Sequence, residues 1–306
     1  MKKSLRFVVA LMISAVAFPL ISVAAASASS APQCIVSLSP SATETLFAIG
    51  AGAQVQAVDQ DSNYPAQAKR LSAQHVINPL SPSVEALLGL CAVTPTHPST
   101  KPDLVVISYN ANSIQQDLTA QGVKVVMQDA PTTVSGALAQ IRQLGQLTGH
   151  QARADALAAS MQRRISADIA SVPAHPTKKI SVYYEISANP YYSLTSSTFV
   201  GSLLKSVGLV NIADADATTA DAGYPQLNAE YIASANPTLI FLAGDAPVAS
   251  VGARPGFSAV SAVVHHNVIG LSANIASRWG PRLTVLMNEI TSSVKRVLNE
   301  KNLWTK

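Results

Sequence analysis

A single uninterrupted helix in the middle of the chain constrains the fold more than any other feature of the sequence. Residues 151–172 contain neither glycine nor proline, and Leu157, Met161, Ile165 and Ile169 repeat at intervals of four. This spacing places four apolar side chains on one face and predicts a long amphipathic helix. Two prolines follow within four residues, so the helix must end there.

Strands and helices alternate on both sides of this helix. Apolar strands are predicted near residues 35–38, 55–58, 101–108 and 123–127 before it, and near 179–186, 237–242 and 267–271 after it. Such alternation is typical of parallel sheets in α/β domains. The sequence therefore predicts an α/β fold of two Rossmann-like lobes with parallel-rich central sheets, joined by a single long α-helix. The expected parts are an N-terminal lobe over 33–148, a linker helix over 149–173 and a C-terminal lobe over 178–303.

Residues 1–28 have the features of a signal peptide. Lys2, Lys3 and Arg6 precede a long apolar run, and an A-x-A cleavage sequence ends at Ala28. An uncleaved membrane anchor is the alternative, but Pro19 and the small residues that follow it favour cleavage near Ala28. We therefore expect an exported, periplasmic protein.

Removal of the signal peptide lowers the net charge of the chain, and this bears on whether it binds nucleic acid. The whole chain has 21 Lys and Arg residues against 17 Asp and Glu residues. Three of the basic residues lie in the signal peptide, so the mature chain would carry 18 against 17, a net charge of +1. No basic patch remains to indicate nucleic-acid binding.

Two cysteines remain after cleavage, Cys34 and Cys91, and an exported chain can join them in a disulfide. A weak internal repeat shows where the second cysteine lies. In each lobe a helix with a glutamate, Glu85 or Glu230, precedes a strand that follows a proline; the separation from glutamate to proline is 17 residues in the first copy and 7 in the second. Residues 91–100 are the extra ten, and the disulfide would fasten this insertion to the first strand.

Residues 34–52 have the pattern of a strand, a turn and a short helix. The apolar run ends at Ser39-Pro40, and Ser41 with Glu44 has the S-x-x-E spacing of a capping box. Ligands bind at the carboxyl ends of strands in open α/β sheets. The turn is therefore a candidate wall of a binding site.

Aromatic residues make up only 5% of the chain, so their positions are informative. Six of them fall in predicted loops or just outside predicted elements, namely Tyr64, Tyr109, Tyr191, Tyr192, Tyr224 and Trp279. Core aromatics would lie inside strands more often. As a set, these six favour an apolar cleft for a large flat ligand, with tyrosine hydroxyls at its rim.

The sequence lacks the motifs of the common enzyme classes. It has no G-x-S-x-G elbow, no P-loop and no G-x-G-x-x-G, and beyond one adjacent pair its six histidines show no metal-ligand spacing. We therefore expect no catalytic residues, no metal site and no resident cofactor. Glu85 and Glu230, taken alone, have the pattern of solvated helix glutamates.

Several segments together resemble a known family. They are IVSLSPSATETLFAIGAG, VQAVDQDSNYP, SPSVEALLGL with KPDLVVIS, YPQLNAEYIASANPTLIFL, and SRWGPRL. These segments resemble the periplasmic cobalamin and ferric-siderophore binding proteins of ABC importers, over most of residues 34–300. The first segment and the S-x-Y-P that follows favour the cobalamin branch.

The resemblance implies two α/β lobes bridged by a rigid helix, a ligand held in the cleft between them, and no catalytic activity. In the cobalamin proteins one glutamate per lobe docks onto arginines of the membrane permease, and Glu85 and Glu230 stand at the matching positions. Bidentate contacts between carboxylates and arginines suit this role. The implied ligand-binding residues are Ser39, Pro40, Ser41, Tyr64, Tyr109, Asn110, Tyr191, Tyr192, Tyr224, Arg278 and Trp279.

The sequence thus predicts a monomeric, exported solute-binding protein that captures cobalamin or a related corrinoid and delivers it to an ABC permease dimer with its ATPase. A ferric-siderophore or haem binder is the alternative within the same family, and an exported α/β hydrolase is the alternative outside it. Siderophore sites usually need cationic side chains. The C-terminal loops offer Arg254, Arg278 and Arg282 as the only candidates, which favours a neutral ligand.

Overall fold

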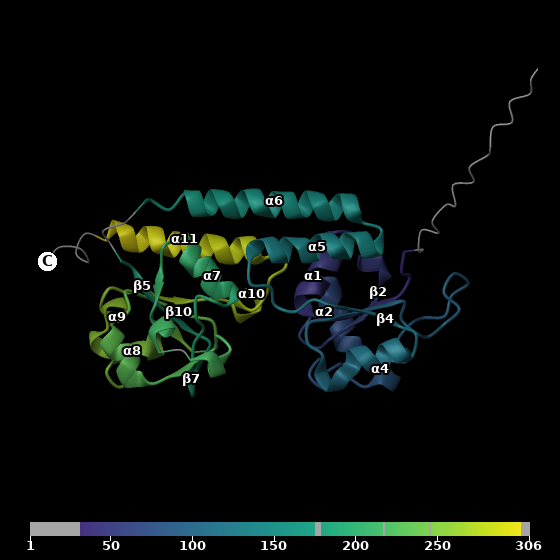
Figure 1. The fold of residues 1–306 in the computed structure, drawn as a ribbon, viewed down its shortest axis with the longest axis horizontal. Helices are drawn as coiled ribbons and strands as arrows, with labels where there is room; N and C mark the ends of the chain where they lie inside the picture. The colour runs from purple at the N-terminus through teal and green to yellow at the C-terminus, as the bar shows by residue number, and fades with distance from the viewer. Residues whose placement is uncertain (1–30, 175–178, 217, 245, 301–306) are drawn as a thin grey trace, which may run out of the picture. The chain divides into compact units, whose positions relative to one another are not determined.

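Two four-stranded parallel sheets organise the fold, one before helix α6 (Gln151–Ala170) in the sequence and one after it (Figure 1). The computed structural model describes residues 31–174, 179–216, 218–244 and 246–300. The predicted signal peptide lies outside the described residues and remains a prediction. The two-lobed α/β class is confirmed, whereas the predicted bounds of the lobes stay a prediction.

The first sheet has the strand order β2-β1-β3-β4, and all neighbouring strands are parallel. Its strands are β1 (Ile35–Leu38), β2 (Val55–Val58), β3 (Leu104–Ile107) and β4 (Lys124–Met127). Its helices are α1 (Pro40–Ala48), α2 (Ala66–Gln74), α3 (Val84–Leu88), α4 (Ile114–Ala120) and α5 (Val134–Thr148), with 3-10 turns η1 (Gly52–Gln54) and η2 (Ala111–Ser113). β3 is buried along its whole length, as expected for a continuous apolar run between two other strands.

The second sheet has the order β8-β5-β10-β11 and is also parallel throughout. Its strands are β5 (Ser181–Glu185), β8 (Val210–Asn211), β10 (Leu239–Leu242) and β11 (Val268–Gly270). Its helices are α7 (Phe199–Ser206), α8 (Ala229–Ala235), α9 (Ser261–Val264), α10 (Ala273–Ala276) and α11 (Leu283–Asn299), with 3-10 turns η3 (Ile212–Ala215), η4 (Thr219–Asp221), η5 (Val248–Ala253) and η6 (Phe257–Ala259). A small antiparallel sheet joins β6 (Ser187–Ala188), β7 (Tyr191–Tyr192) and β9 (Gln226–Leu227).

Both parallel sheets share one topology. Counted from the first strand of each, the spatial order is second, first, third, fourth in both cases. Helices α3 and α8 each precede the third strand of their sheet. The weak internal repeat in the sequence therefore corresponds to two copies of one strand arrangement.

Helix α6 lies along α5 and α11 and packs against both (Figure 1). Its buried positions include Met161 and Ile165, as the periodicity predicts, together with Ala154 and Ala158. The other two predicted positions on this face are only half-buried. Gly145 of α5 faces Ala154 so closely that a Cβ at residue 145 would collide with it. The close approach of α5 and α6 therefore requires glycine there.

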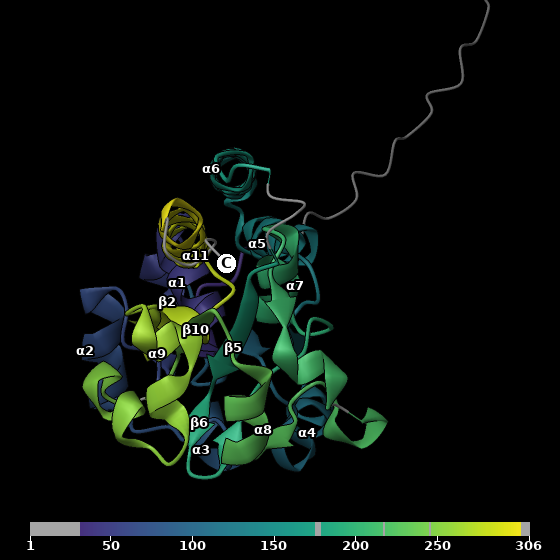
Figure 2. The same cartoon turned by 90° about the vertical axis from the view of Figure 1, so that its left-hand side faces the viewer.

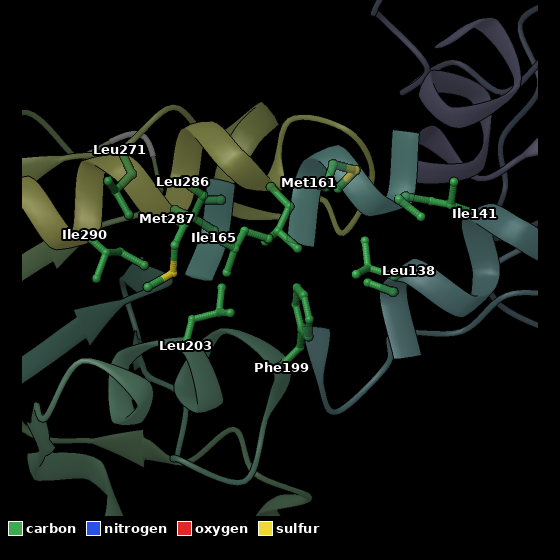
Figure 3. Close-up of a cluster of buried hydrophobic side chains, with 14 of the residues drawn as sticks. Leu138, Ile141, Met161, Ile165, Phe199, Leu203, Leu271, Leu286, Met287 and Ile290 are labelled. Atoms are coloured by element: carbon green, nitrogen blue, oxygen red, sulfur yellow. The ribbon is translucent and has the colours of Figure 1, made fainter. Parts of the chain in front are cut away.

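One apolar core runs through both lobes beneath these helices. Side chains from α5, α6, α7 and α11 meet in it with Leu271, which follows β11 (Figure 3). The helix residues labelled in the figure are Leu138, Ile141, Met161, Ile165, Phe199, Leu203, Leu286, Met287 and Ile290. Each lobe has a further cluster on the other face of its sheet. Because one core is shared, the lobes are packed together rather than joined by the helix alone.

The predicted capping box at Ser41 and Glu44 is wrong. Helix α1 begins at Pro40, and Ser39 is its N-cap, with the hydroxyl accepting a hydrogen bond from the N–H of Ala42. Glu44 is 4% exposed and is bound by Arg282, far along the chain. The S-x-x-E spacing therefore predicted a role for Glu44 at the end of the helix, whereas its carboxylate binds the distant Arg282.

Two other elements departed from the sequence pattern. Helix α2 was not predicted, because its sequence AQAKRLSAQ is polar and buries only Ala68 fully. Tyr191 and Tyr192 were expected in a loop, but they form β7. Tertiary contacts stabilise both elements, α2 by packing against β2 and β7 by pairing with β6 and β9. The sequence of each segment alone does not indicate them.

The disulfide between Cys34 and Cys91 is present, as the sequence predicts. The two ends of the insertion lie next to each other, because the backbone N–H of Cys91 donates a hydrogen bond to the carbonyl of Thr100. His97 lies inside the insertion, with Nε2 3.3 Å from a carboxylate oxygen of Asp103. The other oxygen of Asp103 accepts the N–H of Cys34 at 3.0 Å. The disulfide and this carboxylate together fasten the insertion to the start of β1.

Candidate functional site

A largely apolar cavity of about 270 Å³ is lined mainly by residues of the C-terminal lobe. Three wall residues come from the carboxyl ends of the two central strands of the second sheet: Tyr184 and Ile186 at β5, and Ala243 just after β10. Ala130, which follows β4, represents the N-terminal lobe. The remaining wall residues are Leu194, Thr198, Phe199, Val200, Tyr224 and residues 276–279. The cavity thus lies where open α/β sheets bind their ligands.

Residues 274–282, which we call the bridging segment, run from the C-terminal lobe onto the N-terminal lobe. The backbone N–H of Trp279 donates to Ser41 Oγ at 3.2 Å, and its indole N–H donates to Gln140 Oε1 at 2.8 Å. Gly280 passes so close that a Cβ there would be 2.9 Å from the carbonyl oxygen of Ser41. These contacts hold one wall of the cavity against both α1 and α5.

Two of the three candidate arginines are bound by buried glutamates. Arg254 forms a bidentate pair with Glu185, which is 2% exposed at its side chain. Arg282 forms another with Glu44, again at 2% side-chain exposure. The hydrogen bonds to Glu44 raise the pKa of Arg282. Both guanidinium charges are therefore compensated inside the protein, and neither residue is part of the cavity wall.

Arg278 is the arginine in the cavity wall. Its guanidinium donates to Ser277 Oγ at 2.8 Å and to the carbonyl of Asp61 at 3.3 Å. Burial lowers its pKa. Nearby Asp59 is fully buried and accepts hydrogen bonds from Ser62 Oγ and from the N–H of Asp61, both at 2.8 Å. Burial raises the pKa of Asp59 to about 6.

Three of the ligand-binding residues predicted from the sequence line the cavity: Tyr224, Arg278 and Trp279. They come from two segments more than fifty residues apart. The structure brings them together because the bridging segment follows the last strand of the second sheet.

The Ser-Pro turn takes a different place. Ser39 caps α1 and Pro40 is its first residue. Ser41 is 3% exposed, and its hydroxyl accepts the N–H of Trp279. The turn therefore supports the bridging segment, and its serine hydroxyls are already used within the protein.

Three further predicted residues of the N-terminal lobe lie outside the cavity wall. The guanidinium of Arg282 lies over the Tyr64 ring, 4.5 Å from its centroid, and Tyr64 is 49% exposed. Tyr109 is 62% exposed. The amide of Asn110 bonds to Gln116 at 3.0 Å, which orders the start of α4.

The side chains of Tyr191 and Tyr192 lie on opposite faces of β7, as those of successive residues in a strand do. Tyr191 stacks on Phe257 with ring centroids 6.0 Å apart and packs against a core cluster. Tyr192 is 40% exposed. Neither is among the described residues that line the cavity.

Glu85 and Glu230 occupy equivalent positions. Each is the second residue of a short helix, α3 or α8, that is capped by the side chain before it, Ser83 or Asn228. Both glutamates are exposed. Helix α8 lies on the side of the fold away from α6 (Figures 1 and 2). Helix α3 lies on the same side (Figure 2). The two carboxylates thus repeat one arrangement, one per lobe.

Sequence reasoning missed Tyr184, which lines the cavity and is 1% exposed. Its strand, SVYYE, shows two tyrosines in succession, so one of them must face each side of the sheet. The strand pattern could have drawn attention to the pair, but only the structure shows which ring faces the cavity.

The model of the family described as "Periplasmic binding protein" matches residues 35–275. The chain belongs to the periplasmic binding protein family. It is 30% identical over 271 residues to YvrC of Bacillus subtilis, named as an uncharacterised ABC transporter substrate-binding lipoprotein, covering 86% of this chain and 80% of that one. It is 28% identical over 269 residues to the vitamin B12-binding protein of Pectobacterium atrosepticum, covering 86% and 88%.

Solved structures share the fold of this periplasmic binding protein. The vitamin B12 binding protein BtuF of Vibrio cholerae superimposes with a TM-score of 0.70 at 23% identity, over 88% of this chain and 99% of that one. A periplasmic heme binding protein of Pseudomonas aeruginosa gives 0.72 at 21% identity, over 87% and 93%. The fold alone therefore does not distinguish these ligands.

Family membership makes the chain a solute-binding protein, and periplasmic binding proteins are non-enzymatic components of transport systems. Such proteins act in the periplasm or outside the cell. Among the residues that the structure describes, no helix is both long enough and apolar enough to cross a membrane. The same residues contain no group of three or more His, Cys, Asp or Glu side chains placed to hold a metal ion.

Proposed function

We propose that this periplasmic binding protein, as a monomer, captures cobalamin or a related corrinoid between its lobes and delivers it to an ABC permease. The observation that carries the proposal is the charge of the cavity wall. Of the three candidate arginines, only Arg278 lines it, because Glu185 and Glu44 bind the other two. An apolar wall with little free positive charge suits a large neutral ligand.

Curated relatives support the same ligand class. A cobalamin-binding protein of Halobacterium salinarum is 29% identical over 271 residues, and the Pectobacterium protein described above is named for vitamin B12. The proposed contacts inside the cavity are Tyr224, Arg278 and Trp279. The cavity of about 270 Å³ is slightly smaller than the pockets of about 300–1,000 Å³ that bury drug-sized ligands, and a corrinoid is larger than such ligands.

The ligand must therefore extend beyond the cavity or widen it as it binds. The exposed rings of Tyr64, Tyr109 and Tyr192 are the proposed contacts for the part outside, since each is at least 40% exposed. Aromatic faces of this kind stack on flat macrocycles. Ser39, Pro40 and Ser41 act indirectly in this proposal, by holding the bridging segment in place.

Isothermal calorimetry of the mature protein tests the ligand. We expect cyanocobalamin to bind with a submicromolar Kd, and hemin and a ferric catecholate siderophore to bind far more weakly. Tight binding of hemin with no binding of cyanocobalamin at micromolar concentration would refute the corrinoid assignment and support the haem alternative.

We further propose that Glu85 and Glu230 dock onto arginines of the permease. Their equivalent helix positions and their exposure support this role. Replacing both by alanine should abolish uptake in cells and leave the Kd for cyanocobalamin unchanged. Asp155→Ala, which removes an exposed carboxylate from α6, is the matched control and should preserve uptake. A weakened Kd in the double variant would contradict the docking role.

A further inference from the structure

Tyr184 has a hydroxyl group that the fold leaves unbonded. The residue lines the cavity and is 1% exposed, and its Oη has no hydrogen-bond partner among the described residues. A buried hydroxyl without a partner destabilises the folded state by the free energy of its lost hydration. Such groups are rare in native structures, and each calls for an explanation.

Other polar side chains of the wall are already satisfied. Thr198 Oγ1 donates to the carbonyl of Thr195 and accepts the N–H of Gly201. Ser277 Oγ donates to the carbonyl of Ala273 and accepts from Arg278. Within the described part of the wall, the buried side-chain polar atoms that lack a partner are Tyr184 Oη and Arg278 Nε. Tyr184 Oη is thus an unused donor on a wall residue, and it is covered from solvent.

The preceding residue provides an internal comparison. Tyr183 is also fully buried, and its hydroxyl lies near the carboxylate of Glu185. Its ring belongs to the cluster on the other face of the sheet and does not line the cavity. The two tyrosines are thus neighbours on one strand, and of the two only Tyr184 lines the cavity.

Charges around the cavity limit what Tyr184 can bind. Burial raises the pKa of its hydroxyl, to which the nearby Glu289 adds, so the group stays protonated and can donate. Arg278 is surrounded by the carboxylates of Glu44, Asp59 and Asp61. These carboxylates offset the charges of Arg278 and of the neighbouring Arg282, so the wall has little net positive charge to attract an anionic group.

We propose that the Tyr184 hydroxyl donates a hydrogen bond to a neutral carbonyl group, such as a carboxamide, on the part of the ligand that enters the cavity. This makes Tyr184 a specificity-determining residue of the binding protein. It contacts a group at the periphery of the macrocycle rather than the ring itself. The inference rests on the proposed corrinoid function and adds the chemistry that one part of the site recognises.

Calorimetric titration with cyanocobalamin compares Tyr184→Phe with Tyr183→Phe. We expect Tyr184→Phe to raise the Kd about five- to tenfold, the loss of one neutral hydrogen bond, and Tyr183→Phe to leave it within about twofold. Thermal unfolding without ligand should show Tyr184→Phe no less stable than the wild type, because it loses only an unbonded hydroxyl. A destabilised Tyr184→Phe protein with unchanged Kd would overturn the proposal.

A pair of probes tests the charge of the acceptor. Dicyanocobinamide carries carboxamides at its periphery, and dicyanocobyrinic acid carries carboxylates in their place. The wild type should bind the amide more tightly than the acid at pH 7, and equal or tighter binding of the acid would overturn the neutral acceptor. If the wild type binds no corrinoid at all, the proposed function fails and the inference falls with it. If it binds, and the two phenylalanine variants match it, only the inference fails.

Discussion

Arg282 joins the two lobes through a buried ion pair, and its removal gives a sharp test of the packing. It is the N-cap residue of α11, and its Nε donates to Glu44 Oε2 at 2.9 Å across 238 residues of sequence. The side chains are 18% and 2% exposed. Arg282→Met keeps most of the aliphatic side chain but leaves Glu44 as a buried carboxylate without its bidentate partner.

Breaking a buried pair from one side costs about 3–5 kcal/mol, because an uncompensated charge stays buried. The lost guanidinium over the Tyr64 ring adds about 0.5–1 kcal/mol. We therefore expect the free energy of unfolding to fall by about 4 kcal/mol. At about 2–4 °C per kcal/mol for larger domains, Tm should fall by about 10 °C.

Urea unfolding of the mature protein, followed by circular dichroism, measures this change. The double variant Glu44→Met with Arg282→Met is the companion, because replacing both members of a buried pair by apolar residues is often neutral. It should recover most of the lost stability. A single variant that loses less than about 1 kcal/mol, or a double variant no more stable than the single one, would refute the reasoning.

Three further predictions concern stability. Replacing Cys34 and Cys91 by serine opens a loop of 57 residues and should lower the free energy of unfolding by about 4 kcal/mol, measured by urea titration; an unchanged midpoint would contradict it. Because burial raises the pKa of Asp59 from 3.8 to about 6, the native state holds an extra proton between those values. Relative to Asp59→Asn, the wild type should therefore gain about 2 kcal/mol as the pH falls from 7 to 4.5, and parallel titrations at both pH values would show no difference if Asp59 titrates normally. Gly201→Ala would drive a Cβ into the carbonyl of Thr195 and should cost more than about 2 kcal/mol despite the better helix propensity of alanine; a calorimetric Tm at or above the wild-type value would disprove the clash.

Local signals predicted the elements that depend on local patterns. The i, i+4 spacing located α6, which begins at Gln151 as expected. The apolar run before Ser108 located β3. The two cysteines of an exported chain predicted the disulfide. These signals succeed because periodicity, turn residues and cysteine count are properties of short segments or of composition.

The candidate site was only partly predictable. Tyr224, Arg278 and Trp279, which line the cavity, were predicted because loop aromatics are conspicuous in a chain with few of them and because the surrounding segments resemble a known family. Tyr184 was missed because a tyrosine inside a strand has the pattern of a core residue. Glu44 was misassigned because its S-x-x-E spacing matches a local motif, whereas its partner Arg282 lies at the other end of the fold.

The sequence by itself determined that the chain alternates strands and helices in two blocks, that one long helix separates them, and that a disulfide fastens the insertion. The tertiary structure alone decided where the bridging segment lies, which arginine lines the cavity, and which tyrosine of β5 faces it. The physical reason is the distance along the sequence over which each feature is determined. Helix periods and strand patterns are encoded in neighbouring residues, whereas the cavity is formed by side chains from distant segments whose packing and charge compensation exist only in the folded chain.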